Sequence, residues 1–230
     1  MDSREQVAAA ARRLAAEGLL VGTAGNVSLR DGDRIAVTAT GVVLRDCTPE
    51  QVSVVSTAGD VLEGDLQPTS ELDLHLDVYA ATGAEAVVHT HAPFSTAVAC
   101  VLDELPVIHY QHLLLGGPVR VASYATFGTP ELAANVRDAL ADRQAALMAN
   151  HGSVAIGESL DKAVENALLL EWLATLHHRA NELGTPKTLT DEEQADVITQ
   201  ALQRNYGTTA RVNEDSNKPT PRNPGTNNPA

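Results

Sequence analysis

The arrangement of apolar and polar positions predicts a chain in which helices and short strands alternate. Apolar residues spaced three and four apart, the period of a helix with one buried face, recur in several stretches. Together with capping and proline signals, they predict helices over residues 3–17, 68–83, 94–102, 159–184 and 190–207, and another that opens at Thr129. Short runs that are apolar or rich in β-branched residues predict strands over residues 27–30, 34–38, 52–55, 87–91, 107–110, 119–122 and 145–149.

The domain organisation follows from this alternation. Strands interleaved with helices indicate an α/β fold. Neither an internal repeat nor a linker divides the chain, so we expect one domain over residues 1–212. Asn, Pro, Thr and Gly dominate residues 213–230, where apolar side chains are almost absent. Because such a segment cannot bury enough surface to fold alone, we expect a disordered tail.

Composition and charge restrict the partners. The formal net charge of -14 argues against nucleic acid and against an anionic membrane surface. No apolar run reaches the length of a membrane span, and the polar first residues do not resemble a signal peptide. The two cysteines, Cys47 and Cys100, have neither metal-type nor redox-type spacing. We therefore expect a cytoplasmic protein with free thiols, a single disulfide being the alternative.

Three histidines and one glutamate indicate a metal site. His89 and His91 end an apolar run, and because alternate residues of a strand share a face, both imidazoles should point to one place. His151 follows another apolar run, and Glu71 opens a predicted helix. One histidine so placed is usually a buried core residue, but three with a carboxylate form a common zinc ligand set. His75, one helical turn after Glu71, could orient the carboxylate, although we favour a structural role.

The lysines restrict the chemistry further. The only three, Lys162, Lys187 and Lys218, fall on a predicted exposed helix, after a turn and in the tail. None is placed as the desolvated amine of a Schiff-base enzyme. Carbonyl chemistry in this chain would therefore use a metal as its electron sink.

Hydroxyl-rich turns at residues 22–26, 40–41 and 69–70 are candidates for binding an anion. Backbone N–H groups at a helix that begins near Ser70, together with the hydroxyls, could hold a phosphate without a lysine. Taken one at a time, each segment is more simply a turn or a helix cap. Neither the P-loop pattern nor the dinucleotide-binding pattern is present, which disfavours nucleotide binding.

Eight short motifs, in one order along the chain, resemble the class II aldolase and adducin superfamily. The motifs are Gly22-Thr-Ala-Gly-Asn-Val-Ser28, Thr40-Gly41, Pro68-Thr-Ser-Glu71, Val88-His-Thr-His-Ala92, Val107-Ile-His-Tyr110, Gly116-Gly117, Tyr124-Ala-Thr-Phe-Gly-Thr129 and Asn150-His-Gly152. The resemblance extends from the first predicted helix to about Gly207. The members that it resembles most cleave L-fuculose 1-phosphate.

This resemblance implies a three-layer α/β/α fold with a mixed, mostly antiparallel central sheet. It implies one Zn²⁺ per subunit, or another divalent metal, held by the three histidines and Glu71. Phe127 and Tyr206 would border the pocket for the aldehyde. The substrate phosphate would contact seven residues that offer hydroxyl, amide or backbone donors: Thr23, Gly25, Asn26, Thr40, Gly41, Thr69 and Ser70.

The implied reaction is retro-aldol cleavage of a ketose 1-phosphate to dihydroxyacetone phosphate and an aldehyde such as L-lactaldehyde. Glu71 would protonate C3, and Tyr110 of a neighbouring subunit would take the proton of the C4 hydroxyl. The active sites would then lie at the subunit interfaces of a homotetramer. The chain departs from the resemblance at Thr69, where a serine is usual, and at Asn150, where the aldolases often have histidine.

Three other functions fit part of the pattern. Enzymes that cleave or dehydrate 5-deoxyribulose or methylthioribulose 1-phosphate are compatible with Glu71. L-Ribulose-5-phosphate 4-epimerase is less similar, because it typically has aspartate at that position. An adducin-like scaffold protein without catalysis is disfavoured, because the metal ligands are intact in this sequence.

Overall fold

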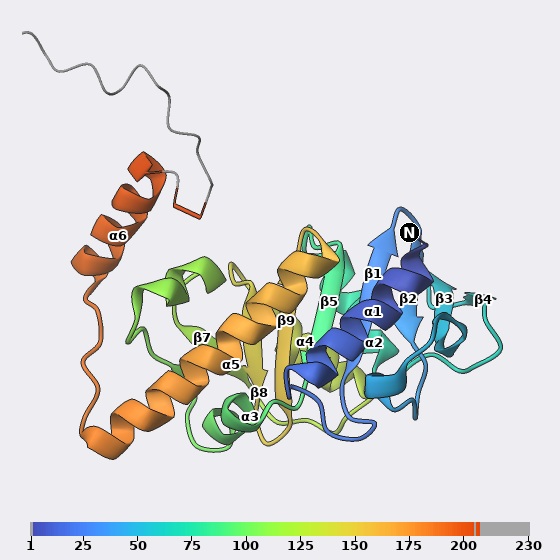
Figure 1. Ribbon diagram of the computed structural model, residues 1–230, viewed down its shortest axis with the longest axis horizontal. Coiled ribbons are helices and arrows are strands. Elements are labelled where there is room, and N and C mark those ends of the chain that lie inside the picture. Colours follow the sequence, from blue (N-terminus) through green and yellow to red (C-terminus); the bar gives the residue numbers. More distant parts are fainter. Residues whose placement is uncertain (1, 205, 208–230) are drawn as a thin grey trace, which may run out of the picture.

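The computed structural model describes residues 2–204, 206 and 207, and shows one sheet with helices on both faces (Figure 1). Over these residues, nine strands follow the order β4-β3-β2-β1-β5-β9-β8-β7-β6. Neighbouring strands are antiparallel, except that β7 and β8 are parallel. The strands are β1 (Asn26–Asp31), β2 (Arg34–Thr38), β3 (Val52–Ser56), β4 (Val61–Glu63), β5 (Ala86–Thr90), β6 (Glu104–Leu105), β7 (Val119–Ala122), β8 (Ala145–Met148) and β9 (Gly152–Gly157).

Helices form the two outer layers. On one face lie α1 (Ser3–Ala16), α3 (Pro93–Ala99) and α5 (Leu160–Leu183). The other face is covered by α2 (Leu72–Ala81) and α4 (Pro130–Ala139). The last helix, α6 (Asp191–Arg204), lies apart from the sheet (Figure 1) and packs against the 3-10 segment η3 (Tyr110–Leu115).

Both faces of the sheet are buried. In β5, Ala86 and Val88 belong to the core beneath α1, α3 and α5, whereas Val87 belongs to the core beneath α2 and α4. Because neither face meets solvent, the central strands are nearly continuous apolar runs rather than alternating ones. The predicted three-layer fold with a mostly antiparallel sheet is thus confirmed.

The strand predicted over residues 107–110 is wrong. The carbonyl oxygen of Val107 accepts a hydrogen bond from the backbone N–H of Leu189, which lies outside the sheet. Tyr110 begins η3, where the Nδ1 atom of His109 accepts a hydrogen bond from the N–H of Gln111. Three strands, β4, β6 and β9, have no counterpart in the sequence prediction.

The first residues of α2 and α3 set the backbone positions of Glu71 and His91. Helix α2 begins at Leu72, so Glu71 occupies the capping position with non-helical dihedral angles (φ -106°, ψ 27°). Helix α3 begins two residues after His91, and the Glu171 carboxylate accepts hydrogen bonds from the backbone N–H groups of Phe94 and Ser95. This carboxylate satisfies N–H groups that a helix start leaves without an intrahelical partner.

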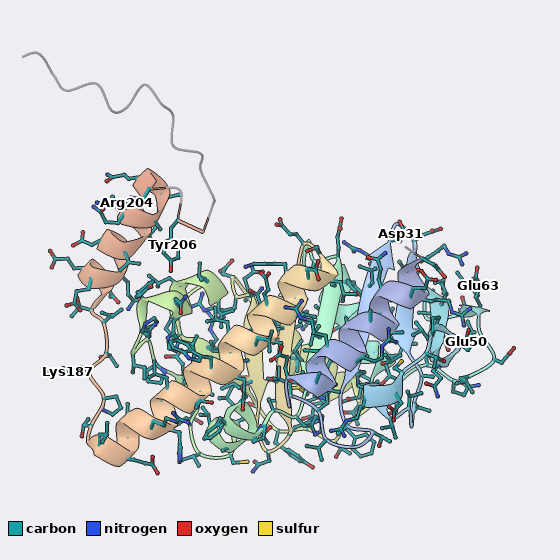
Figure 2. The ribbon with its side chains drawn as sticks, in the orientation of Figure 1. Asp31, Glu50, Glu63, Lys187, Arg204 and Tyr206 are labelled. Carbon is teal, nitrogen blue, oxygen red and sulfur yellow. The ribbon has the colours of Figure 1, made fainter. Side chains whose placement is uncertain are left out.

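The remaining features are the two ends of the molecule, the lengths of the helices and the two cysteines. Figure 2 shows Arg204 and Tyr206 by α6, at the end opposite to Asp31, Glu50 and Glu63. No helix of the described residues is long and apolar enough to cross a membrane. Cys47 is buried, Cys100 is exposed, and both are free thiols. The tail expected over residues 213–230 lies outside the described residues.

Candidate metal centre and active site

The sheet brings three histidines to one point. His89 lies in β5, His91 follows that strand, and His151 lies in the turn between β8 and β9. The Nε2 atoms of His89 and His91 are 3.0 Å apart, and the three ring centroids are 4.8 to 4.9 Å from one another. The two imidazoles of the His-x-His motif therefore face the same point, as their spacing predicts.

Glu71 closes this group from the start of α2. Its Oε2 atom lies 3.2 Å from Nε2 of His89 and accepts a 2.9 Å hydrogen bond from the Asn26 amide. Its Oε1 atom lies 3.5 Å from Nε2 of His151 and is buried without a hydrogen-bond partner. Burial opposes ionisation of Glu71, but its contacts with His89, Asn26 and His151 outweigh this effect and hold its pKa well below the usual range. The side chain is therefore a carboxylate.

The donor set fits a divalent metal. The Nδ1–H of His89 donates a 2.9 Å hydrogen bond to the carbonyl oxygen of Ser153, so its Nε2 presents a lone pair to the Glu71 carboxylate. Burial lowers the pKa of His91 to about 4 and also lowers that of His151, which keeps both rings neutral. Lone pairs that converge in this way need a shared cation, and three imidazoles with one carboxylate match the ligand preferences of zinc.

A cavity of about 440 Å³ opens beside these residues. Glu71, His91 and His151 line it on one side, while His89 is fully buried behind them. Most of the predicted substrate contacts line the same cavity: Thr23, Gly25, Asn26, Thr40, Gly41, Thr69, Ser70 and Phe127. None of the described lining residues is a lysine or an arginine, so the groups that could bind an anion here are neutral donors.

Gly25 is required by the close approach of two segments at this cavity. Its φ angle of 92° is one that residues with a side chain rarely adopt. A Cβ atom at this position would lie 2.8 Å from the carbonyl oxygen of His89. The glycine therefore lets the turn before β1 pack against the strand that carries the metal-site histidines.

Two predicted site residues lie elsewhere in the chain. Tyr110 and Tyr206 contact each other, with hydroxyl oxygens 3.1 Å apart, beside an apolar groove of about 570 Å³ between η3 and α6. The hydrogen bond with Tyr206 raises the pKa of Tyr110, so the phenol is protonated at neutral pH. Neither tyrosine lines the histidine cavity of the same subunit.

The structure adds Tyr124 and Asn150 to the lining of the cavity and gives His75 a different partner from the one expected. Tyr124, which is 61% exposed, lines the cavity together with Asn150. Asn150 has a φ angle of 54°, and an asparagine before His-Gly is a turn signal that could have identified it. His75 is fully buried and contacts Asn26 rather than Glu71, so any effect that it has on the carboxylate passes through the amide.

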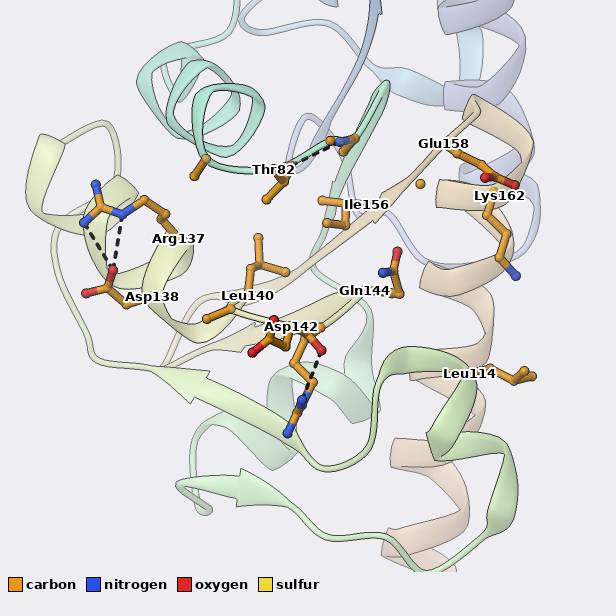
Figure 3. Close-up of a pocket in the computed structure, with 16 residues that line it drawn as sticks. Thr82, Leu114, Arg137, Asp138, Leu140, Asp142, Gln144, Ile156, Glu158 and Lys162 are labelled. Carbon is orange, nitrogen blue, oxygen red and sulfur yellow. Dashed lines mark hydrogen bonds and ion pairs between the residues drawn. The ribbon is translucent and has the colours of Figure 1, made fainter. Parts of the chain in front are cut away.

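A larger cavity, of about 880 Å³, lies elsewhere, between the α2–β5 and α4–β8 connections (Figure 3). Its described lining includes Arg137, Asp138 and Lys162 and shares no residue with the histidine cavity. Arg137 is already paired with Asp138 there. We place the chemistry at the smaller cavity, because it is there that titratable side chains able to hold a metal converge among the described residues.

Comparison with known proteins identifies the family to which the chain is similar. The sequence profile of the family described as "Class II Aldolase and Adducin N-terminal domain" matches residues 5–178. A 5-methylthioribulose-1-phosphate/5-deoxyribulose-1-phosphate aldolase of Rhodospirillum rubrum is 37% identical over 88% of this chain and 91% of its own length. The L-fuculose phosphate aldolase of Escherichia coli K12 is 40% identical over 79% of this chain and 85% of its own. A solved L-fuculose 1-phosphate aldolase superposes with a TM-score of 0.83 at 33% identity, over 86% of this chain and 95% of that one.

Proposed function

The chain belongs to the class II aldolase and adducin family, and from this we propose that it cleaves a ketose 1-phosphate in a metal-dependent retro-aldol reaction. The bond between C3 and C4 breaks, giving dihydroxyacetone phosphate and an aldehyde. The observation that carries the proposal is the convergence of His89, His91, His151 and Glu71 beside a cavity lined by neutral donors.

The three histidines and Glu71 would hold one Zn²⁺, or another divalent metal, in each subunit. Bound there, the metal supplies a Lewis acid that draws electron density from the C2 carbonyl as the C3–C4 bond breaks. The fixed tautomer of His89 prepares this site, because Ser153 holds its Nδ1–H and leaves Nε2 free to bind.

The phosphate would be held without a cationic side chain. The turn before β1, the segment after β2 and the approach to α2 contribute hydroxyls, an amide and backbone N–H groups to one cavity. Such groups form anion-binding concavities when several N–H groups point to the same place. The residues proposed for this role are Thr23, Gly25, Asn26, Thr40, Gly41, Thr69 and Ser70.

Two residues would move protons. Glu71, after taking up a proton from water, would deliver it to C3 from Oε1, the carboxylate oxygen that has no hydrogen-bond partner in the described structure. Tyr110 of a neighbouring subunit would accept the proton of the C4 hydroxyl, directly or through water, as that carbon becomes the aldehyde, while its own phenolic proton would pass to solvent. Its exposure of 40% and its distance from the histidine cavity of its own chain support a role across an interface. The proposed assembly is a cytoplasmic homotetramer.

The substrate would end in an apolar group. Tyr124 and Phe127 are both more than half exposed at the cavity. We place Phe127 at the aldehyde end, together with Tyr206 of the neighbouring subunit, which contacts Tyr110 there. Cleavage of L-fuculose 1-phosphate gives L-lactaldehyde, and cleavage of 5-deoxyribulose or methylthioribulose 1-phosphate gives an aldehyde that ends in a methyl or methylthio group. We keep both candidates, because the L-fuculose phosphate aldolase has the higher identity and the methylthioribulose/deoxyribulose enzyme the longer alignment.

A panel of substrates tests the proposal. The purified, zinc-loaded protein is incubated with L-fuculose, 5-deoxyribulose and methylthioribulose 1-phosphates, and dihydroxyacetone phosphate is measured by a coupled reduction. Release from at least one of them, abolished by a chelator and restored by zinc, supports the aldolase. Epimerisation of L-ribulose 5-phosphate without release would favour the epimerase, and protein that binds no metal would favour the scaffold.

A further inference from the structure

Five buried polar side chains are joined end to end between α2 and β1. The chain of contacts runs from Tyr79 through Ser28, His75 and Asn26 to Glu71, and every one of these residues is at most 6% exposed. The distances are 2.7 Å from Tyr79 to Ser28, 2.6 Å from Ser28 to Nδ1 of His75, 2.5 Å from Nε2 of His75 to Asn26, and 2.9 Å from Asn26 to Glu71.

The Asn26 amide fixes the direction of these hydrogen bonds. Its nitrogen only donates and faces Oε2 of Glu71, and its oxygen only accepts and faces His75. Nε2 of His75 therefore carries a hydrogen and donates it to the Asn26 oxygen. A neutral imidazole has one N–H, so its Nδ1 must accept from the hydroxyl of Ser28, which in turn accepts from Tyr79.

Burial keeps His75 and Tyr79 uncharged. Burial, with the neighbouring His89, lowers the pKa of His75 to about 3, so the ring is neutral at physiological pH. Burial also raises the pKa of Tyr79, so its hydroxyl retains the proton that it donates. The donors of the hydrogen-bond chain therefore point toward Glu71, since Tyr79 lies closer to the Ser28 hydroxyl (2.7 Å) than to the carbonyl oxygen of Glu85 (3.5 Å).

We propose that Tyr79, Ser28, His75 and Asn26 form a directional hydrogen-bond chain that fixes Oε2 of Glu71 and leaves Oε1 to carry the catalytic proton. This inference rests on the proposed function of Glu71. His75 and Asn26 are positioning residues in this account: His75 acts only through the amide that it orients. Asn26 thus has a task for its side chain beyond any contact with the phosphate.

The two carboxylate oxygens have different surroundings. Oε2 accepts the Asn26 hydrogen bond, whereas Oε1 is buried with no hydrogen-bond partner in the described structure. A proton on Oε1 leaves Oε2 free to accept from Asn26 as before. The hydrogen-bond chain therefore needs no rearrangement when Glu71 takes up or releases a proton, and the carboxylate keeps one orientation throughout.

The tautomer of His75 tests the direction of the hydrogen-bond chain. This measurement does not require the protein to be active. A long-range ¹H–¹⁵N correlation spectrum of the full-length protein, labelled with ¹⁵N-histidine, reports which ring nitrogen carries the hydrogen. The His75 signals are assigned by their loss in His75→Gln. We expect His75 to be protonated at Nε2 and unprotonated at Nδ1 at pH 7. A hydrogen on Nδ1 would overturn the proposal.

Two substitutions of His75 test the positioning role. Gln can donate to Asn26 and accept from Ser28, whereas Leu can do neither. We expect His75→Leu to lower kcat, and the rate at which dihydroxyacetone phosphate exchanges a C3 hydrogen with D₂O, by about 10- to 100-fold. KM and bound zinc should stay within about twofold of wild type, and His75→Gln should regain most of the lost rate.

Asn166→Leu is the matched control. Asn166 is 1% exposed, and its amide donates to the carbonyl oxygen of Ile156 on the other face of the sheet. Its substitution also buries an apolar side chain in a polar position, but the exchange rate should not change. An unchanged exchange rate in folded His75→Leu would overturn the proposal. Wild-type protein that neither cleaves nor exchanges would instead refute the proposed function, and if His75→Leu does not fold, the tautomer measurement decides.

Discussion

The Nδ1–H of His89 donates a 2.9 Å hydrogen bond to the carbonyl oxygen of Ser153, across the pairing of β5 with β9. This contact fixes the ring so that Nε2 points to His91 and Glu71. The candidate metal site is therefore built into the centre of the sheet, with its fourth member at the start of α2. Such a site has its ligand geometry prepared before the metal binds.

Substitution His89→Ala should remove the metal. It deletes one of three imidazoles and the ring that Ser153 orients, so the remaining ligands form an incomplete set. We expect zinc near one ion per subunit in the wild type and almost none in the variant, measured by elemental analysis after dialysis. His178→Ala, which removes a histidine whose side chain is 54% exposed on α5, should retain the metal. A His89→Ala protein that kept both zinc and activity would refute the ligand set.

Substitution Gly152→Ala should weaken metal binding through backbone displacement. A Cβ atom at Gly152 would overlap the carbonyl oxygen of Thr90 and lie 3.3 Å from Cδ2 of His91. The shift needed to relieve this contact moves two segments that carry ligands, so we expect the zinc dissociation constant to rise by about tenfold or more. Gly83→Ala is the control, because no atom lies within 4 Å of the added Cβ. Equal zinc affinity in both variants would contradict the role given to this contact.

The metal-free protein should lose stability as the pH falls from about 6.5 to about 4. Burial lowers the pKa of His75 to about 3 and that of His112 to about 4, from an ordinary value of 6.5. The unfolded chain therefore binds protons in this range that the native state does not, so the free energy of unfolding decreases with decreasing pH.

Urea unfolding of the wild type and of His112→Gln, measured between pH 7 and pH 4.5, checks this expectation. Each such histidine contributes a slope of at most about 1.4 kcal/mol per pH unit. The variant lacks one of them and should show a shallower dependence, whatever its stability at pH 7. Parallel curves for the two proteins would show that His112 does not titrate as described.

Activity should be recovered by mixing two inactive subunits. If Tyr110 completes the site of a neighbouring subunit, a tetramer of Tyr110→Phe and Glu71→Gln chains contains sites that have both native residues. A random equal mixture restores about a quarter of the sites in a head-to-tail ring. The two chains are co-expressed with different tags, purified together and compared with each parent. Mixed tetramers no more active than the parents would contradict the placement of Tyr110 across an interface.

The sequence predicts the metal-site geometry well where local spacing decides it. His89 and His91 share a face because they are alternate residues of a strand, and the structure places their Nε2 atoms 3.0 Å apart. Helix positions were also predictable, from caps and proline, to within a few residues. The family resemblance covers the same segments, so pattern and resemblance agree there.

The remaining features depend on tertiary packing. The contact between His75 and Asn26 joins residues 49 positions apart, and no periodicity links them. Strand β9 (Gly152–Gly157) was missed because it is buried on both faces and bounded by glycines, so it shows no alternation. Residues 107–110 have a strand-like composition, but Val107 pairs with Leu189 and not with the sheet.

The most direct test of the central claim compares wild-type protein with Glu71→Gln, both loaded with zinc. Dihydroxyacetone phosphate release from the preferred ketose 1-phosphate is measured, together with the zinc bound per subunit. Loss of a proton-transferring residue should lower turnover by about 10²- to 10⁴-fold, while the metal stays bound by the three histidines. Turnover near that of the wild type in a zinc-bound Glu71→Gln protein would contradict the account.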